Sequence, residues 1–207
     1  MKMGKTAIKF LLLLVSSLLL SSCSLLVPAK AYNPTLYRLN PHISQANKIS
    51  SPSQLSLLVL PTIASPELNT RKMAYALGRH QIAYYAQNSW VARPTQMLSP
   101  LITQALRKNG YFYAVVPAPF AGKTNLILYT QLLALEQDFT THPSTVHMIL
   151  AAQVINVNSS KILGAHQFSV VVPTPEGNPA GGAYAANQAT AQILQELTQF
   201  CVQVSGR

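Results

Sequence analysis

Hydrophobic residues recur along the chain with two different periods. Apolar runs, and apolar–polar alternation with a period of two, predict β-strands. Such stretches are 55–60, 72–87, 111–116, 126–135, 146–157 and 162–172. Helical spacing of apolar positions predicts one helix from the region of Pro94 and another from Pro179. This order predicts an α/β fold, a single domain with a mixed β-sheet of about six to seven strands and at least two packed helices.

Turn residues connect two pairs of these predicted strands. Residues 78–80 (Gly-Arg-His) predict the turn of a hairpin within 72–87, which residues 88–89 (Asn-Ser) bring to an end. Residues 158–161 (Asn-Ser-Ser-Lys) join the last two strands into a long hairpin. Gly164 lies inside the second of these strands and predicts a β-bulge there.

The helix ends are marked by proline, asparagine and glycine. Asn178 is a good N-cap for the final helix, and Gly110 predicts the end of the first one. The start of the first helix stays open between two alternatives. Either it begins at Pro94 and kinks at Pro100, or Ser99 is its N-cap and Pro100 its first residue.

The N-terminal residues predict an exported protein with a lipid anchor. After a start with three lysines, the apolar run from Phe10 to Leu20 is too short for a comfortable membrane span and suits a signal peptide, predicted as residues 1–22. Leu20-Ser21-Ser22-Cys23 resembles the bacterial lipobox, which implies a covalent diacylglycerol and an N-acyl lipid on Cys23. By the same resemblance, Ser24 implies the outer membrane as destination. An ordinary secretory signal with an incidental cysteine is the alternative.

The remaining chain divides into a tether and a domain. Residues 23–52 are rich in Pro, Ser and Asn and predict a lipidated tether. Residues 35–39 alternate as an edge strand would, and if they pair with the domain, the free tether shrinks to 24–34. Residues 53–207 predict one domain, because their number suffices for one hydrophobic core.

Charge is sparse and positive. Charged residues are 10% of the chain, and removal of Lys2, Lys5 and Lys9 with the signal lowers the net charge from +10 to +7. The remaining cations are scattered, without the runs that follow a phosphate backbone, so nucleic acid is excluded as a partner. A surface with so little charge resists self-association poorly and hints at partners or oligomers. With Cys23 lipidated, Cys201 has no disulfide partner and is expected to be a buried thiol.

Motifs for catalysis, cofactors and metals are missing or incomplete. Residues 121–124 (Ala-Gly-Lys-Thr) match the end of a phosphate-binding loop, but Pro117 occupies the place of its first glycine. Glu136 and Asp138 would share a strand face, and solvated acids that end a strand explain them better than a catalytic pair. The five histidines lack the spacing of a zinc site. We therefore expect a protein that is not an enzyme, with no metal and no cofactor beyond the lipid on Cys23.

Several segments resemble the ABC-type transport auxiliary lipoprotein family. Besides the lipobox they are 37–39, 68–75, 84–98, 110–116, 135–139 and the Ala-rich closing helix. They span nearly the whole mature chain, and the tryptophan followed by a helix and an aromatic strand is the most specific part. Arg71, Tyr75 and Trp90 fall on the family's pattern without any catalytic role, and Trp90 is expected to anchor the core.

The resemblance implies a non-catalytic accessory protein of a lipid transport system. Its partners would be an MCE-domain substrate-binding protein and an ABC permease and ATPase, which together move phospholipid or other hydrophobic molecules across the periplasm. The chain would be the docking element at the periplasmic face of the outer membrane of a Gram-negative bacterium, with a homo-oligomeric ring as one arrangement.

Two other classes remain as alternatives. A structural or assembly lipoprotein, such as a pilotin for a secretion system, would share the anchor and the tether, and mislocalised secretin after deletion would reveal it. A direct lipid carrier would need an internal apolar cavity, and purification without bound lipid would speak against it.

Overall fold

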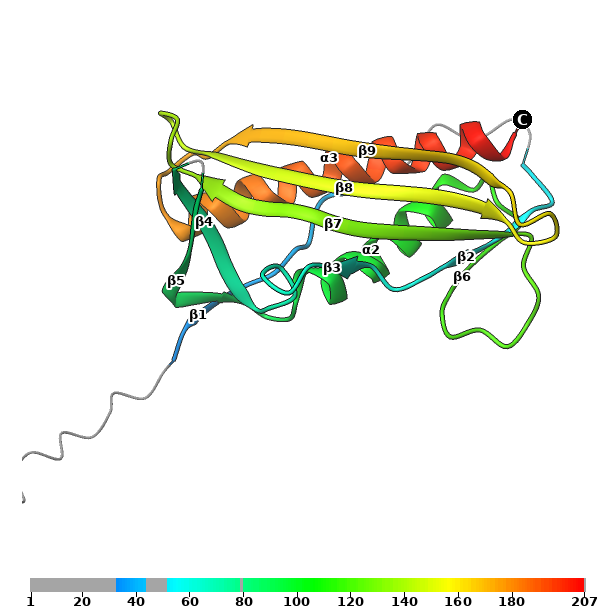
Figure 1. Cartoon of the computed structure of the whole chain (residues 1–207), viewed down its shortest axis with the longest axis horizontal. Coiled ribbons are helices and arrows are strands. Elements are labelled where there is room, and N and C mark those ends of the chain that lie inside the picture. Colours follow the sequence, from blue (N-terminus) through cyan, green and yellow to red (C-terminus); the bar gives the residue numbers. More distant parts are fainter. Residues whose placement is uncertain (1–32, 44–51, 79, 207) are drawn as a thin grey trace, which may run out of the picture. The chain divides into compact units, whose positions relative to one another are not determined.

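The computed structural model describes residues 33–43, 52–78 and 80–206, and a compact unit begins at Pro34. Two helices and nine strands form in this part of the chain (Figure 1). The strands are β1 (Thr35–Tyr37), β2 (Ser56–Val59), β3 (Ile63–Ala64), β4 (Lys72–Gly78), β5 (Gln81–Trp90), β6 (Ala114–Pro117), β7 (Leu126–Asp138), β8 (Thr145–Asn156) and β9 (Ile162–Pro173). The helices are α2 (Pro94–Asn109) and α3 (Pro179–Ser205).

The sheet is mixed, and β7 is its central strand. One edge of β7 pairs antiparallel with β8 along its whole length, from Leu126 to Asp138. Its other edge pairs in parallel with β2, then with β3 and finally with β4. Beyond these, β6 pairs with β2, while β5 and then β1 extend the sheet from β4. Strands distant in the sequence are thereby held in one sheet.

The three long strands β7, β8 and β9 form an antiparallel meander. β9 pairs with β8 in a ladder whose register shifts between Val154 and Ile155. Gly164 lies opposite Val154, so the bulge falls where the glycine predicted it. A Cβ at Gly164 would lie 2.7 Å from the Cγ1 atom of Val204, so the glycine also allows α3 to approach β9 closely.

Helix α2 begins at Pro94 and contains Pro100, which decides between the two predicted starts. The backbone N–H of Arg93 donates to the side chain of Gln96 at the start. The Ser99 hydroxyl donates to the carbonyl of Thr95 one turn earlier, as it does inside a helix and not at an N-cap. At the other end Gly110 has a φ of 74°, the left-handed cap that the sequence predicted.

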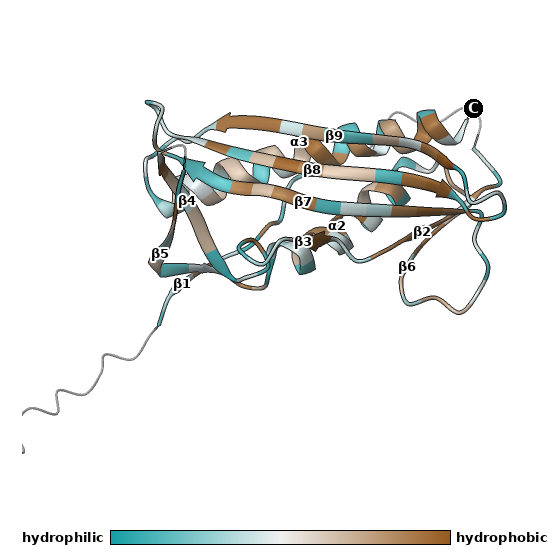
Figure 2. Cartoon of the chain, in the orientation of Figure 1, coloured by the Kyte–Doolittle hydropathy of each residue, from teal (hydrophilic) through white to brown (hydrophobic). Residues whose placement is uncertain are grey.

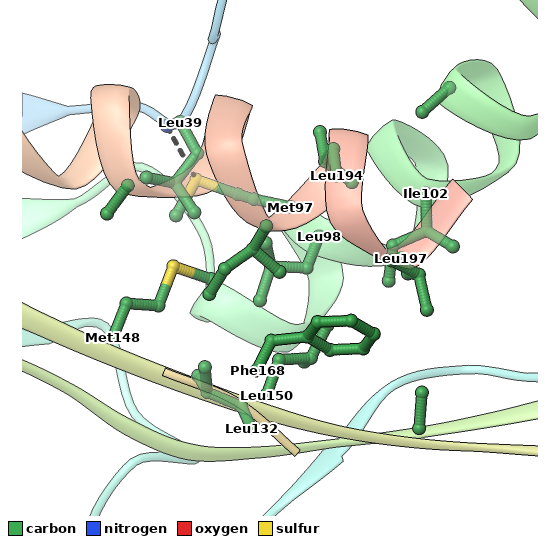
Figure 3. Close-up of a cluster of buried hydrophobic side chains, with 14 of the residues drawn as sticks. Leu39, Met97, Leu98, Ile102, Leu132, Met148, Leu150, Phe168, Leu194 and Leu197 are labelled. Atoms are coloured by element: carbon green, nitrogen blue, oxygen red, sulfur yellow. Dashed lines mark hydrogen bonds between the residues drawn. The ribbon is translucent and has the colours of Figure 1, made fainter. Parts of the chain in front are cut away.

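Both helices pack on the same face of the sheet and close a single core (Figures 1 and 3). Strand positions with a period of two supply one side of this core, including Leu132, Met148 and Leu150, which are fully buried. Leu194 and Leu197 of α3 meet them from the helical side. The first turns of α3 contribute glycine and alanine, and small residues let the helix lie close to the strands.

The N-terminal segment takes part in this core. Leu39 is 6% exposed, and its N–H donates to the sulfur of Met97 (Figure 3). β1 pairs in parallel with the end of β5, where Tyr37 lies opposite Trp90. Thr35–Tyr37 thus pair with the domain as an edge strand, the alternative left open for this part of the predicted tether, and belong to the compact unit.

The sheet has more strands than the predicted six to seven. The additional strand β3 has two residues, too few to show a period in the sequence. β5 continues through residues 88–89, which were expected to end the hairpin, because this segment pairs with both β1 and β4. β6 begins at Ala114 and not at Tyr111.

Packing of α3 against the sheet should dominate stability. Ile193 is 1% exposed in this interface, so Ile193→Ala is expected to lower the free energy of unfolding by about 2–5 kcal/mol through lost burial and a residual cavity. Urea denaturation of the two proteins measures the difference. Tyr184→Ala on the same helix, at a side chain that is 58% exposed, should change stability by no more than about 0.5 kcal/mol. Equal effects of both changes would contradict the packing described.

Candidate functional site

Both helices cover one face of the sheet and leave the other face open (Figure 1). Residues of β7, β8 and β9 line a groove of about 830 Å³. The ladders align its residues in two rows across β7, β8 and β9. One row contains Tyr129, Gln153 and Ala165, and the next contains Gln131, Ala151 and Gln167. Leu60, Pro61 and Ile63 form the wall beside β7. The alanines form the floor of the groove, because their side chains are shorter than those on either side.

No Lys, Arg, Asp or Glu side chain of the described residues lines this groove, whereas His166 does. The amides of Gln131, Gln153 and Gln167 have no hydrogen-bond partner within the described part of the chain, so each can bond to a bound molecule. Each amide can both donate and accept, which suits the backbone of a polypeptide. Phosphate recognition would call for cations or a cluster of N–H groups instead. The groove therefore has the chemistry of a surface for neutral, partly apolar protein segments.

A network of polar side chains lies between the β4–β5 hairpin and α3. The Tyr85 hydroxyl donates to Oε1 of Gln137 at 3.0 Å, and Nε2 of Gln137 donates to the Ser144 hydroxyl at 3.0 Å. Ser144 and Thr174 hydroxyls lie 2.6 Å apart. These contacts tie β5, β7 and the segments that flank β8 and β9 together. Burial, and to a smaller extent Tyr75, raise the pKa of Tyr85 to about 12.

This network is neutral at physiological pH and has a structural role. Gln137 is 3% exposed and accepts and donates within the network. Gly182 of α3 makes room for it, since a Cβ there would lie 2.3 Å from Oε1 of Gln137. At neutral pH the members of the network are uncharged hydroxyls and one amide, because burial keeps the hydroxyl of Tyr85 protonated. Its geometry positions the hairpin against α3.

The residues on the family's pattern lie along the β4–β5 hairpin. Trp90 is 4% exposed, as expected for a core anchor, and its N–H donates to the carbonyl of Arg71 at 2.7 Å. The Nε of Arg71 in turn donates to the carbonyl of Trp90. Tyr75 lies farther along the hairpin, with its ring 4.7 Å from that of Tyr85 and 5.9 Å from that of Phe139. Arg71 and Trp90 thus close one end of the hairpin, and Tyr75 packs inside it.

The acidic residues and the glycine-containing loop show no catalytic arrangement. Asp138 is the last residue of β7, and its carboxylate accepts from the N–H of Thr140 at 2.7 Å, which is a turn contact. Glu136 lies on the open face opposite His147. Residues 121–124 belong to the loop before β7, whereas a phosphate-binding loop leads into a helix.

Metal and thiol chemistry are equally unsupported in the part of the chain that the structure describes. Among residues 33–43, 52–78 and 80–206, no group of three His, Cys, Asp or Glu side chains could hold a metal ion. Cys201 is fully buried, and burial raises the pKa of its thiol to about 12. Cys23, the predicted lipidation site, lies outside the described residues.

Two features of these sites were not predicted from the sequence. Gln137 occupies a core-facing position in the alternation of β7, and a polar residue in such a place is a signal for a buried network. The groove depends on the register of three strands and on the position of β3, and the sequence carries no signal for either.

Comparison with known families identifies the chain. The model for the ABC-type transport auxiliary lipoprotein component matches residues 37–198. This covers most of the 207 residues, so the chain belongs to that family and the predicted resemblance is confirmed. Membership agrees with a bacterial lipoprotein that assists ABC-type transport and with the expectation of a non-enzymatic role. Within the described residues, the structure has no helix long and apolar enough to cross a membrane.

Solved structures share the fold at low sequence identity. The crystal structure of protein XCC0632 from Xanthomonas campestris has a TM-score of 0.76 and 18% identity, covering 83% of this chain and 97% of that one. An uncharacterised protein has a TM-score of 0.63 and 11% identity, with coverage of 82% and 99%. A PelC dodecamer from Paraburkholderia phytofirmans is less similar, with a TM-score of 0.46 and 12% identity, covering 75% of this chain and 96% of that one. No curated protein sequence matches the chain.

Removal of the Tyr85 hydroxyl should destabilise the network. In Tyr85→Phe the buried Oε1 of Gln137 loses its donor, and the free energy of unfolding is expected to fall by about 1–3 kcal/mol. Tyr84→Phe on the same strand removes an exposed hydroxyl that donates to the carbonyl of Glu67, with an expected change below about 0.5 kcal/mol. Urea denaturation of both variants gives the comparison, and similar small losses would show that the network contributes little.

Cys201 should make stability depend on alkaline pH. Its thiol stays protonated in the folded chain up to about pH 12, whereas in the unfolded chain it ionises near its ordinary pKa of 9.0. Since the unfolded chain binds fewer protons in this interval, the free energy of unfolding falls as pH rises through it. Cys201→Ala should flatten that fall in urea titrations. In a Cys23→Ala background the native thiol should resist iodoacetamide at pH 8, and rapid native labelling would contradict its burial.

Proposed function

We propose that this chain is the lipid-anchored docking element of an MCE-type ABC transport system at the outer membrane. The family match over residues 37–198 carries the proposal, because it makes the chain an auxiliary lipoprotein of ABC-type transport. The lipobox-like sequence ending at Cys23 supports anchoring, and Ser24 supports the outer membrane over the inner one. The partners would be an MCE-domain protein with its permease and ATPase, and the cargo phospholipid or another hydrophobic molecule.

The uncharged groove is the surface that we assign to the transporter. It exposes three free amides and the apolar side chains of Ile63 and Tyr129, which are 61% and 45% exposed. A partner segment that covers them gains apolar burial and hydrogen bonds without desolvating a charge. Because the groove is an open depression and not an enclosed cavity, it supports protein docking better than transport of lipid by the chain itself.

A ring of several copies around one transporter belongs to the same proposal. Sparse charge favours it, because neighbouring copies would repel each other weakly. Anchoring by acyl chains is strong, since each buried CH₂ contributes about 0.8 kcal/mol. A short tether would keep every copy close to the membrane.

Affinity purification tests the partners. Tagged, lipidated protein from gently solubilised envelopes should recover the MCE-domain protein with the permease and ATPase. Gln153→Arg places a charge in the groove and should reduce this recovery at least about tenfold, the effect of about 1.4 kcal/mol of lost binding. Tyr184→Arg adds the same charge at an exposed side chain of α3, outside the groove, and should leave recovery unchanged.

Cysteine variants test lipid anchoring independently of binding to the transporter. Cys23→Ala should move the protein from the outer-membrane fraction to the soluble periplasm, while Cys201→Ala should stay with the membrane. Recovery of secretin or other assembly components, without any transporter subunit, would refute the transport proposal and favour a pilotin-like role.

A further inference from the structure

Cations gather at the end of the domain where β7 begins. The N–H of Val157, just after β8, donates to the carbonyl of Asn125, just before β7. The β8–β9 turn and the β6–β7 loop therefore lie side by side. Helix α2 ends at the same place, because Nε of Arg107 donates to the carbonyl of Val115 in β6. Exposed cations from these three segments form what we call the basic end: Arg107, Lys108, Lys123 and Lys161.

The acidic residues of the chain lie elsewhere. Glu136 and Asp138 are among the last residues of β7, and Glu176 follows the end of β9, which lies beside them across β8. Glu67 lies beside the β4–β5 hairpin, and Glu196 lies in the middle part of α3. The chain has five acidic residues, so the basic end carries four positive charges and no negative one.

The two ends of the domain differ in net charge as a result. In the described part of the chain, the other cations lie around β1 and the β4–β5 hairpin, namely Arg38, Arg71, Lys72 and Arg93. Four of the five acids lie on that side as well, so positive and negative charges balance there. A chain with few charges thus presents its net positive charge at one end of β7, where it can attract an anionic partner.

Exposed apolar side chains accompany the cations of the basic end. Tyr113 is 76% exposed, Ile162 57% and Phe120 46%. Tyr113 follows α2, Ile162 begins β9, and Phe120 belongs to the β6–β7 loop that projects from this end (Figure 1). Figure 2 shows that the hydrophobic colour of β2, β7 and β8 also reaches this end. The surface therefore combines positive charge with apolar groups.

We propose that the basic end binds the surface of a bilayer that contains anionic phospholipid, in the membrane that holds the lipid anchor. Lysine and arginine pair with the headgroup phosphates, while the exposed apolar side chains enter the boundary with the acyl chains. Three of the four cations are lysines, a residue that is depleted in protein–protein interfaces and common on membrane-binding surfaces. An acidic protein surface fits this composition less well.

The length of chain before the domain allows this contact. The compact unit begins at Pro34, and residues 24–33 span at most about 36 Å when fully extended. β7 has 13 residues and is therefore about 43 Å long. An anchor at Cys23 keeps the domain beside its membrane, and the basic end reaches the surface when β7 is inclined toward it. This choice of membrane rests on the proposed anchoring, whereas affinity for anionic lipid does not.

Vesicle binding tests the contact. The mature chain from Ser24 to Arg207 contains the whole compact unit and carries no lipid. In co-sedimentation at low salt, its partition into an equimolar mixture of phosphatidylglycerol and phosphatidylcholine should be at least about tenfold stronger than into phosphatidylcholine alone. Added salt should remove most of this difference, because it screens the charges.

Two matched pairs of substitutions locate the contact, all at exposed side chains. Lys123→Gln combined with Lys161→Gln removes two charges from the basic end and should weaken partition about fivefold for each lysine. Arg38→Gln combined with Lys72→Gln lowers the net charge equally on the other side of the domain. This second pair should weaken partition less than about twofold, because these charges lie farther from the lipid than salt screening allows.

A fluorescent label tests the contact in the lipidated protein. In proteoliposomes of the same mixture, an environment-sensitive label on Phe120→Cys should gain emission and be quenched by lipids with a nitroxide in their acyl chains. The same label on Leu77→Cys, at a side chain that is 60% exposed near the far end of β4, should not. Cys201 is buried and does not compete for the label.

Three results would overturn the proposal: no preference for anionic vesicles, equal losses in the two pairs of variants, or equal quenching at the two labelled positions. Binding of Lys123 and Lys161 to a transporter subunit without binding to vesicles would also overturn it and identify an acidic protein as the occupant. The vesicle assay contains no transporter, so its failure and a failure of the proposed transport function are distinguishable.

Discussion

The hydrogen-bond ladder of β7 holds the whole sheet together, because both of its edges are shared with other strands. One edge pairs with β8 from end to end, with a register shift between Leu132 and Ala134, and the other pairs with β2, β3 and β4 in succession. The outer strands β6, β5 and β1 reach the sheet only through these neighbours. Since β7 also contributes Leu126, Leu128 and Leu132 to the core, its pairing and its burial depend on each other. The helices then close the face that this strand organises.

The predictable parts of the fold are those with a period or a special backbone position. The long hairpin, the bulge at Gly164 and the cap at Gly110 follow from alternation and from glycine. β3 could not be predicted, since its two residues show no period and their pairing comes from a distant part of β7. Polar residues 88–89 resemble a turn, yet Ser89 is buried because β1 and β4 flank it. In each of these misses, long-range pairing outweighs a local signal.

The candidate sites also divide into features that local sequence predicts and features that depend on long-range pairing. Cys201 as a buried thiol follows from its apolar context, and Trp90 as a core anchor was expected from the family resemblance. The groove requires three strands in register, with Gln153 of β8 placed between Tyr129 and Ala165. Its neutral amides fit the docking role proposed for this surface. The sparse charge of the sequence has its structural counterpart in this groove.

The β4–β5 hairpin is attached to the rest of the sheet by a short ladder. β4 meets β7 over three residue pairs, from Ala74 to Ala76, and the Tyr85–Gln137 hydrogen bond and the core side chains Met73 and Trp90 supply further attachment. Elements with few ladder bonds open at a lower free energy than the whole domain. The chain should consequently behave as two cooperative units in native-state hydrogen exchange. The amide hydrogens of this hairpin would exchange through local opening, whereas those of the β7–β8 ladder would exchange only through global unfolding.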